Sequence, residues 1–367
     1  VCTVMNFMTP LQRYQQDLLR PDFVADPAQK MAVEHLQRLY DELVVRSEKS
    51  GLLSGLFRRK KEPCKGLYFW GGVGRGKTYL MDTFFESLPF DKKMRLHFHR
   101  FMRRVHQEIR TLKDQDNPLD IVADRLASEA YVLCFDEFFV SDIADAMILG
   151  NLMEKLFARG VSLVATSNIV PDRLYENGLQ RERFLPAIAT LKANVEVLNV
   201  DGGTDYRLRT LEQAELYHWP LDAEADATLA SSFAALSPVP GRKNVELEVE
   251  GRTIHARQVA DDVAWFDFAA LCDGPRSQND YIELAREYHT VLISNIPALH
   301  NGIDDQVRRF INLVDEFYDR SVNLVVSAEK PLETLYSGGR LTFEFLRTQS
   351  RLLEMQSHEY LAREHRP

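Results

Sequence analysis

The sequence predicts an α/β fold in which helices flank a parallel β-sheet. Short apolar runs recur along the first 200 residues, at 67–70, 94–98, 131–135, 161–166 and 195–200. The stretches between most of them are long enough for a helix and carry apolar residues at three- and four-residue spacing. Strands that alternate with helices favour a parallel sheet with right-handed crossovers. With 45% apolar and 27% charged residues in 367, the chain has the composition of a globular protein with a full core.

A capped helix is expected before the first strand. Asp26 and Pro27 form a typical helix start, and apolar residues follow at helical spacing: Met31, Ala32, Leu36, Leu39, Tyr40 and Leu43. A glycine-containing, basic stretch comes next. Residues 1–65 are therefore predicted to form an N-terminal helical segment and a linker.

The first strand leads into a loop with the phosphate-binding pattern G-x-x-x-x-G-K-[ST]. The matching residues are Gly71, Gly72, Val73, Gly74, Arg75, Gly76, Lys77 and Thr78. Apolar residues at helical spacing follow, so the loop ends where a helix begins. Loop N–H groups and a helix N-terminus can surround a phosphate. Lys77 is expected to reach the β- and γ-phosphates and Thr78 to bind Mg²⁺. Because we find no guanine-reading N/T-K-x-D motif, ATP and Mg²⁺ are the expected cofactors.

Two adjacent acids, Asp136 and Glu137, follow the strand at 131–135. The carboxyl ends of the strands form the side on which an open α/β sheet binds ligands. Asp136 is expected to hold Mg²⁺, directly or through water, and Glu137 to polarise the attacking water. An acidic helix start is the alternative interpretation.

The strand at 161–166 ends in a polar tip that includes Asn168. In P-loop ATPases of the AAA+ class an asparagine at this place senses the γ-phosphate, and Asn168 resembles it; a turn-forming asparagine is the alternative. The same class places an arginine further on that reaches the neighbouring subunit's nucleotide. Arg181 and Arg183 are both candidates, and a surface ion pair is the alternative for either. The expected assembly is a homo-oligomer with a trans-acting arginine.

The second half of the chain has a different pattern of strand- and helix-forming residues. Residues 201–280 are predicted to be a β-rich insertion with a hairpin around 250–251. Strand and helix patterns return in 281–367, at 290–295, 307–318 and 322–327, and resemble the stretch 132–167, with Asn295 at the place of Asp136. We expect an ATPase core at 66–200 and, at 281–367, a C-terminal α/β extension of the same sheet that ends in a helix.

Six motifs resemble those of one family, the bacterial cell-division ATPase ZapE and its mitochondrial relatives. They are GLYFWGGVGRGKTYLMD, HFHRFM, LCFDEF, ATSN, GLQRERFLPAI and FEFLRTQSRL. The resemblance covers nearly the whole chain. It implies an AAA+ type P-loop ATPase that remodels a protein partner, which in bacteria is the division protein FtsZ. The mitochondrial relatives are linked to quality control of inner-membrane proteins, which is retained as an alternative function.

Charge and hydropathy restrict the partners. A formal net charge of −9 argues against stable nucleic-acid binding. The basic sets 58–61 and Arg100, Arg103, Arg104 and Arg110 leave a helicase-loader type of ATPase as a second alternative. We find neither a membrane-span pattern nor a signal-peptide layout. A cytoplasmic protein is expected, with any peripheral membrane association through partners.

Three further sites are suggested by their position relative to these motifs. Gln29 could contact adenine, as an upstream glutamine does in some P-loop ATPases, or be an ordinary helix-surface residue. Phe101 and Met102 are expected to form an exposed contact for a protein partner, with burial as the alternative. Arg347 and Arg351 are candidates for sensing nucleotide from the C-terminal side.

Overall fold

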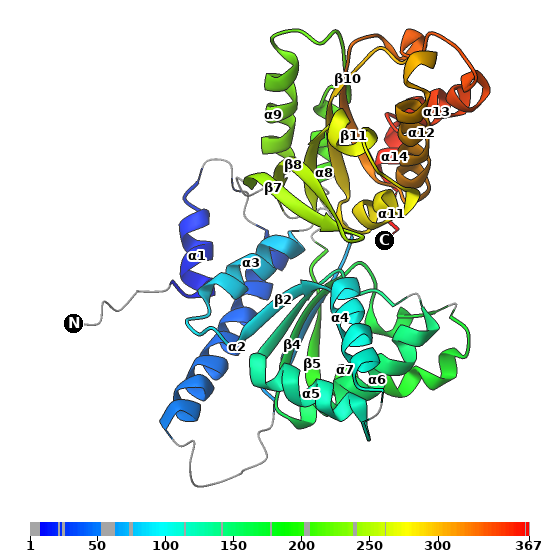
Figure 1. Cartoon of the computed structure of the whole chain (residues 1–367). Helices are drawn as coiled ribbons and strands as arrows, with labels where there is room; N and C mark the ends of the chain where they lie inside the picture. Colours follow the sequence, from blue (N-terminus) through cyan, green and yellow to red (C-terminus); the bar gives the residue numbers. More distant parts are fainter. Residues whose placement is uncertain are drawn as a thin grey trace. The chain divides into compact units, whose positions relative to one another are not determined.

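The computed structural model describes residues 8–20, 23, 26–52, 63–72, 76–113, 115–140, 142–176, 178–201, 206–237, 241–260, 262–363 and 365–366. The chain divides into two compact units, Val1–Thr204 and Asp205–Pro367. Each unit has its own β-sheet, covered by helices on both faces (Figure 1).

Unit 1 contains a five-stranded parallel sheet. Its strands are β1 (Gly66–Trp70), β2 (Lys93–His97), β3 (Val132–Asp136), β4 (Ser162–Ser167) and β5 (Val195–Asn199), in the order β2-β3-β4-β1-β5. The predicted α/β class with a parallel sheet is confirmed. Because β4 lies between β1 and β3, the three strands that precede the phosphate loop, the acids and Asn168 are neighbours. Their carboxyl ends meet at one edge of the sheet.

Two groups of helices cover the faces of this sheet (Figure 1). One face packs against α1 (Pro10–Asp17), α2 (Pro27–Leu52) and α3 (Lys77–Ser87), and the other against α4 (Phe98–Thr111), α5 (Pro118–Glu129), α6 (Ile143–Ala158) and α7 (Leu185–Asn194). Side chains alternate along a strand, so β1 sends Leu67 and Phe69 to the first face and Tyr68 to the second. Burial on both faces explains why the strands are almost continuously apolar.

Unit 2 contains a six-stranded mixed sheet. Its strands are β6 (Tyr217–His218), β7 (Arg242–Val249), β8 (Arg252–Ala260), β9 (Val263–Asp267), β10 (Thr290–Ile296) and β11 (Asn323–Ala328), in the order β6-β11-β10-β9-β8-β7. The first four in this order are parallel, and β7, β8 and β9 are antiparallel neighbours. The predicted hairpin is confirmed: Glu250 and Gly251, both with positive φ, join β7 to β8.

One expected detail of the fold differs in the structure. The strands near 290–295 and 322–327 pair with β9 and β6 in this second sheet and do not extend the first one. An apolar run predicts that a segment is a buried strand but does not specify its neighbour. Since β8 and β9 are continuous with β10 in the sheet, residue 280 does not separate a β-rich insertion from a C-terminal extension.

The helices of unit 2 also lie on two faces. One face packs against α8 (Tyr206–Gln213) and α9 (Ala225–Leu236), and the other against α10 (Phe268–Cys272), α11 (Gln278–Glu287), α12 (Asp304–Asp319), α13 (Thr342–Glu354) and α14 (His358–Leu361). Along β10, Val291 and Ile293 belong to the larger core and Leu292 to the smaller one. Within the described ranges, no helix has the length and apolar character needed to span a membrane.

Candidate nucleotide site of unit 1

The phosphate-loop lysine contacts the polar end of β4. Lys77 Nζ donates to the carbonyl oxygens of Gly71 and Gly72, each at 2.6 Å, and to Asn168 Oδ1 at 2.8 Å. Two predicted site residues, 91 positions apart in the sequence, are thereby brought together. Val73, Gly74 and Arg75 of the loop lie outside the described residues.

Gly76 ends the loop in a conformation that glycine adopts readily. Its φ is 74° and its ψ is 21°, and it stands immediately before α3. A Cβ on Gly76 would lie 2.3 Å from Nε2 of Gln29, so a side chain there would displace the buried glutamine. Within the described ranges no side chain caps the start of α3, so none of these side chains competes with an anion for the first N–H groups of the helix.

Gln29 itself is buried against this loop. Among the described residues its Oε1 accepts no hydrogen bond. An unpaired acceptor beside the phosphate loop is compatible with the expected contact to the adenine amino group, and the surface-glutamine alternative does not match the burial.

Asp136 at the end of β3 is held by an arginine that belongs to none of the predicted site residues. Arg95 on β2 donates from Nε to Asp136 Oδ2 at 2.7 Å and from Nη2 to Oδ1 at 3.4 Å, and it also pairs with Asp82 on α3. Burial lowers the pKa of Arg95, but the two carboxylates outweigh this effect and hold it above its ordinary value. The guanidinium therefore stays charged. An arginine in a short strand next to the acid-bearing strand was the only sequence signal.

Glu137 occupies a left-handed turn directly after Asp136. Its φ is 53°, which is uncommon for a residue with a side chain. The Glu137 N–H donates to Thr166 Oγ1 at 3.3 Å, and the Phe138 N–H donates to the Thr166 carbonyl at 2.7 Å. Ser167 Oγ adds a bond to the Phe138 carbonyl at 2.8 Å. The polar tip of β4 thus fixes the turn that carries the predicted catalytic carboxylate.

The second unit repeats this turn without its acids. Asn295 has a φ of 63°, and its N–H donates to Ser327 Oγ at 3.2 Å. Asn295 therefore corresponds to Glu137, and Ser294 takes the place of Asp136. The expected match of Asn295 with Asp136 is therefore wrong by one residue. An apolar run alone does not fix the alignment of two strand ends.

The two candidate arginines differ in their surroundings. Both lie in the short 3-10 helix Arg181–Arg183. Arg181 is partly buried and donates from Nη2 to the Asp172 carbonyl at 2.5 Å. Arg183 is exposed, and its side chain forms no hydrogen bond or ion pair with another residue of the described ranges.

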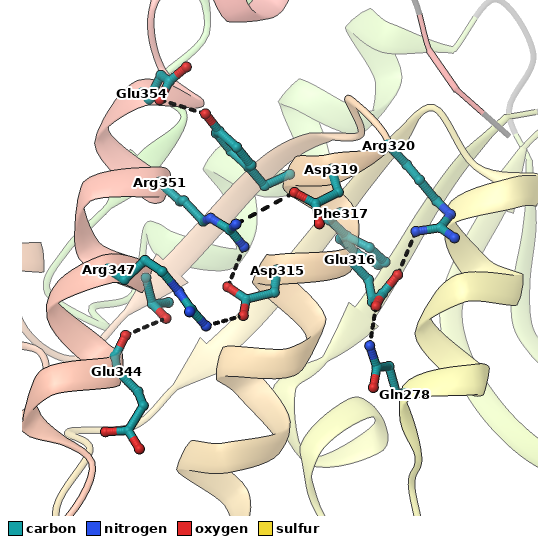
Figure 2. A network of polar contacts seen from close by, with 12 residues as sticks. Gln278, Asp315, Glu316, Phe317, Asp319, Arg320, Glu344, Arg347, Arg351 and Glu354 are labelled. Carbon is teal, nitrogen blue, oxygen red and sulfur yellow. Dashed lines mark hydrogen bonds and ion pairs between the residues drawn. The ribbon is translucent and has the colours of Figure 1, made fainter.

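Arg347 and Arg351 lie on α13 and face α12 (Figure 2). Both pair with Asp315 at 2.5 Å, and Arg351 also pairs with Asp319 at 3.5 Å. The Arg351 guanidinium lies 4.7 Å from the centre of the Tyr318 ring. These contacts join two helices of unit 2, and a nucleotide-sensing role for either arginine stays a prediction.

The expectation of an exposed contact at Phe101 and Met102 is wrong. Their exposed fractions are 0% and 1%, and the ring centres of Phe101 and Phe135 are 4.5 Å apart. Phe98, Phe101, Met102 and Val105 follow helical spacing and form the inner face of α4. On the outer face, Arg104 is paired with Glu108 and Glu129, which reduces the positive charge of the basic set.

Comparison with known proteins agrees with the predicted family. The model of the AFG1-like ATPase family matches residues 8–364. The chain is 51% identical over 372 residues to "Cell division protein ZapE" of Escherichia coli K12, covering 98% of this chain and 99% of that protein. It is 38% identical over 348 residues to "Lactation elevated protein 1 homolog B" of Danio rerio, covering 82% and 69%.

Among solved structures, the crystal structure of DnaI is similar to 49% of this chain and 89% of its own, with a TM-score of 0.35 and 17% identity. The family assignment rests on the sequence matches, which cover nearly the whole chain. The chain belongs to the AFG1-like ATPase family and is an ATP-hydrolysing enzyme of that family.

Proposed function

We propose that this chain hydrolyses Mg·ATP at the carboxyl edge of the unit 1 sheet and uses the hydrolysis to remodel a protein partner, FtsZ polymers, during cell division. The observation that carries the proposal is the contact of Lys77 with Asn168. It joins the phosphate-binding lysine to a strand tip that also holds Glu137 in place. The cell-division name of the Escherichia coli relative supports the choice of partner. We further propose that the protein acts in the cytoplasm and reaches membranes only through partners.

The side chains present fit Mg·ATP by their chemistry. Lys77 and the N–H groups at the start of α3 supply positive charge for the phosphates. Thr78 and Asp136 supply the oxygen ligands that Mg²⁺ prefers. Bound Mg²⁺ would neutralise charge on the phosphates and hold them in line. Lys77 would exchange its carbonyl contacts for phosphate oxygens, which leaves Asn168 beside the terminal phosphate.

Glu137 and an arginine complete the proposed machinery. The Glu137 carboxylate would accept a hydrogen bond from the attacking water and orient it. We assign the trans-acting role to Arg183, because its side chain is exposed and unpaired among the described residues, whereas Arg181 is engaged with the Asp172 carbonyl. Each complete site then needs two copies of the chain.

Sedimentation of FtsZ polymers tests the proposed partner. A protein that couples hydrolysis to remodelling must bind its partner differently in the ATP and ADP states. We expect polymer yield and co-sedimentation to differ between ATP and ADP at constant GTP. With ATP, Glu137→Gln should keep the polymer yield and co-sedimentation of the ATP state, because it binds ATP without hydrolysing it. Lys77→Ala should give the same yield with either nucleotide. Identical yields for the wild-type chain and Glu137→Gln with either nucleotide would exclude FtsZ as the partner while leaving the ATPase assignment intact.

A further inference from the structure

Three charged side chains from three elements form an ion cluster at the edge of the proposed metal site. Arg95 on β2 lies between Asp136 on β3 and Asp82 on α3. The exposed fractions of these side chains are 21%, 12% and 18%. Ion pairs this deeply placed are screened much less by salt and water than surface pairs. We name Asp82, Arg95 and Asp136 the Arg95 cluster.

The cluster contains two negative charges and one positive charge. Arg95 contacts both oxygens of Asp136, the same oxygens that a divalent cation would use. A cation that binds Asp136 therefore meets the like charge of Arg95 a few ångströms away, and the two compete for the carboxylate.

We propose that Arg95 is the exchangeable counter-ion of the Mg²⁺ site: it neutralises Asp136 when the metal is absent and is retained by Asp82 when the metal binds. This inference rests on the proposed role of Asp136 as a metal ligand. Asp82 is what makes the exchange feasible. Once Asp136 turns to the metal, Asp82 still pairs the guanidinium, so no buried charge is left uncompensated.

The position of Asp82 gives the exchange a structural consequence. Asp82 lies four residues after Thr78, one turn further along α3 on the same side of the helix. Metal binding would therefore release Arg95 from β3 and leave it paired with the helix that begins at Lys77. The Arg95 cluster thereby connects the metal state of the site to the helix that carries the phosphate loop.

A different role for Arg95 predicts the opposite response. If Arg95 only fixed the orientation of the Asp136 carboxylate, its removal would weaken metal binding. If Arg95 competes with the metal, its removal strengthens metal binding. The sign of the change separates a positioning residue from an exchangeable counter-ion.

The test measures the Mn²⁺ dependence of nucleotide binding in the full-length chain. A fluorescent, non-hydrolysable ATP analogue is bound at increasing free Mn²⁺, and the half-saturating Mn²⁺ concentration is determined. We expect Arg95→Gln to lower this concentration about tenfold, a conservative figure for removing a like charge at this distance. Asp82→Asn should raise it, because Arg95 then has Asp136 as its sole partner in the cluster.

Unchanged or raised half-saturating Mn²⁺ in Arg95→Gln overturns the proposal. If Arg95→Gln does not fold, as judged by circular dichroism, Asp82→Asn decides alone, and an unchanged or lowered value overturns the proposal. Thermal unfolding without nucleotide is a second readout: Mn²⁺ should stabilise Arg95→Gln more than the wild type. Asp136→Asn is the control for the underlying site. A wild-type Mn²⁺ response in that variant would contradict the metal role of Asp136 itself.

Discussion

At the scale of single residues, the site depends on how β4 holds its neighbours. Thr166 fixes the backbone of Glu137 and Phe138, and Asn168 contacts Lys77 two positions further along. Hydrogen bonds of the backbone therefore position Glu137, whereas hydrogen bonds of the side-chain amine position Lys77. Substitutions at the two positions should have different effects.

We predict that Lys77→Ala abolishes ATP binding, whereas Glu137→Gln retains it and loses hydrolysis. The first change removes the positive charge that faces the phosphates. The second keeps the shape and the hydrogen bond to Thr166 but removes the carboxylate, and a loss of about 10²- to 10⁴-fold in turnover is expected for a general base. Calorimetric ATP binding and steady-state turnover provide the two measurements. An equal loss of ATP affinity in both variants would contradict the role given to Glu137.

At the scale of elements, the local sequence pattern predicts whether a segment is a helix or a strand, but it does not always predict the neighbours of that segment in the fold. The phosphate loop, the acids and Asn168 were identifiable because each follows an apolar strand, and strand ends in a parallel sheet share one edge. Arg95 was not identifiable, because its two partners come from other elements and only the fold brings them together. The predicted exposure of Phe101 and Met102 is wrong because the helical spacing of α4 identifies an apolar face but not the side chains that cover it.

His218 lies on the short edge strand β6 between two carboxylates. The His218 side chain is 10% exposed, with Nδ1 at 3.1 Å from Glu215 Oε2 and Nε2 at 3.4 Å from Asp222 Oδ1. Burial lowers the pKa of His218, but the two carboxylates outweigh burial and raise it above its ordinary value. The protonated form is thus favoured in the folded protein.

We predict that His218 contributes stability that is complete below its ordinary pKa of about 6.5. This contribution is lost as the pH rises through the raised pKa of the folded state. His218→Gln should remove this part of the pH dependence of thermal unfolding, measured from about pH 6 upward. His255→Gln, an exposed change on β8 of the same unit, is the matched control. The assignment fails if the wild type and His218→Gln lose stability in parallel over this range.

At the scale of the whole molecule, the proposed site is incomplete in one chain. The described residues of unit 1 supply the lysine, the acids and the asparagine. We propose that the exposed Arg183 acts on the site of another copy of the chain. Arg181 and Arg183 are two residues apart, so variants at the two positions form a closely matched pair.

We predict that Arg183→Ala lowers ATP turnover by about 10³-fold or more, as expected for an arginine finger. Arg181→Ala should instead act mainly through the lost hydrogen bond to Asp172, costing about 1 kcal/mol of stability. Mixing Arg183→Ala with Glu137→Gln should restore part of the turnover, because a site between the two kinds of subunit has both intact groups. Failure of every mixing ratio to restore turnover would rule out action across a subunit boundary.

The strand order of unit 1 has a consequence for how the chain is made. β1 begins at Gly66, whereas its neighbours β4 and β5 begin at Ser162 and Val195. During synthesis the apolar segment Leu67–Trp70 therefore leaves the ribosome long before the strands that pair with it. Unpaired apolar strands of this kind promote aggregation. Until β4 has been translated, α2 and α3, which flank β1 in the sequence and share a core with Leu67 and Phe69, are the elements that can cover this segment.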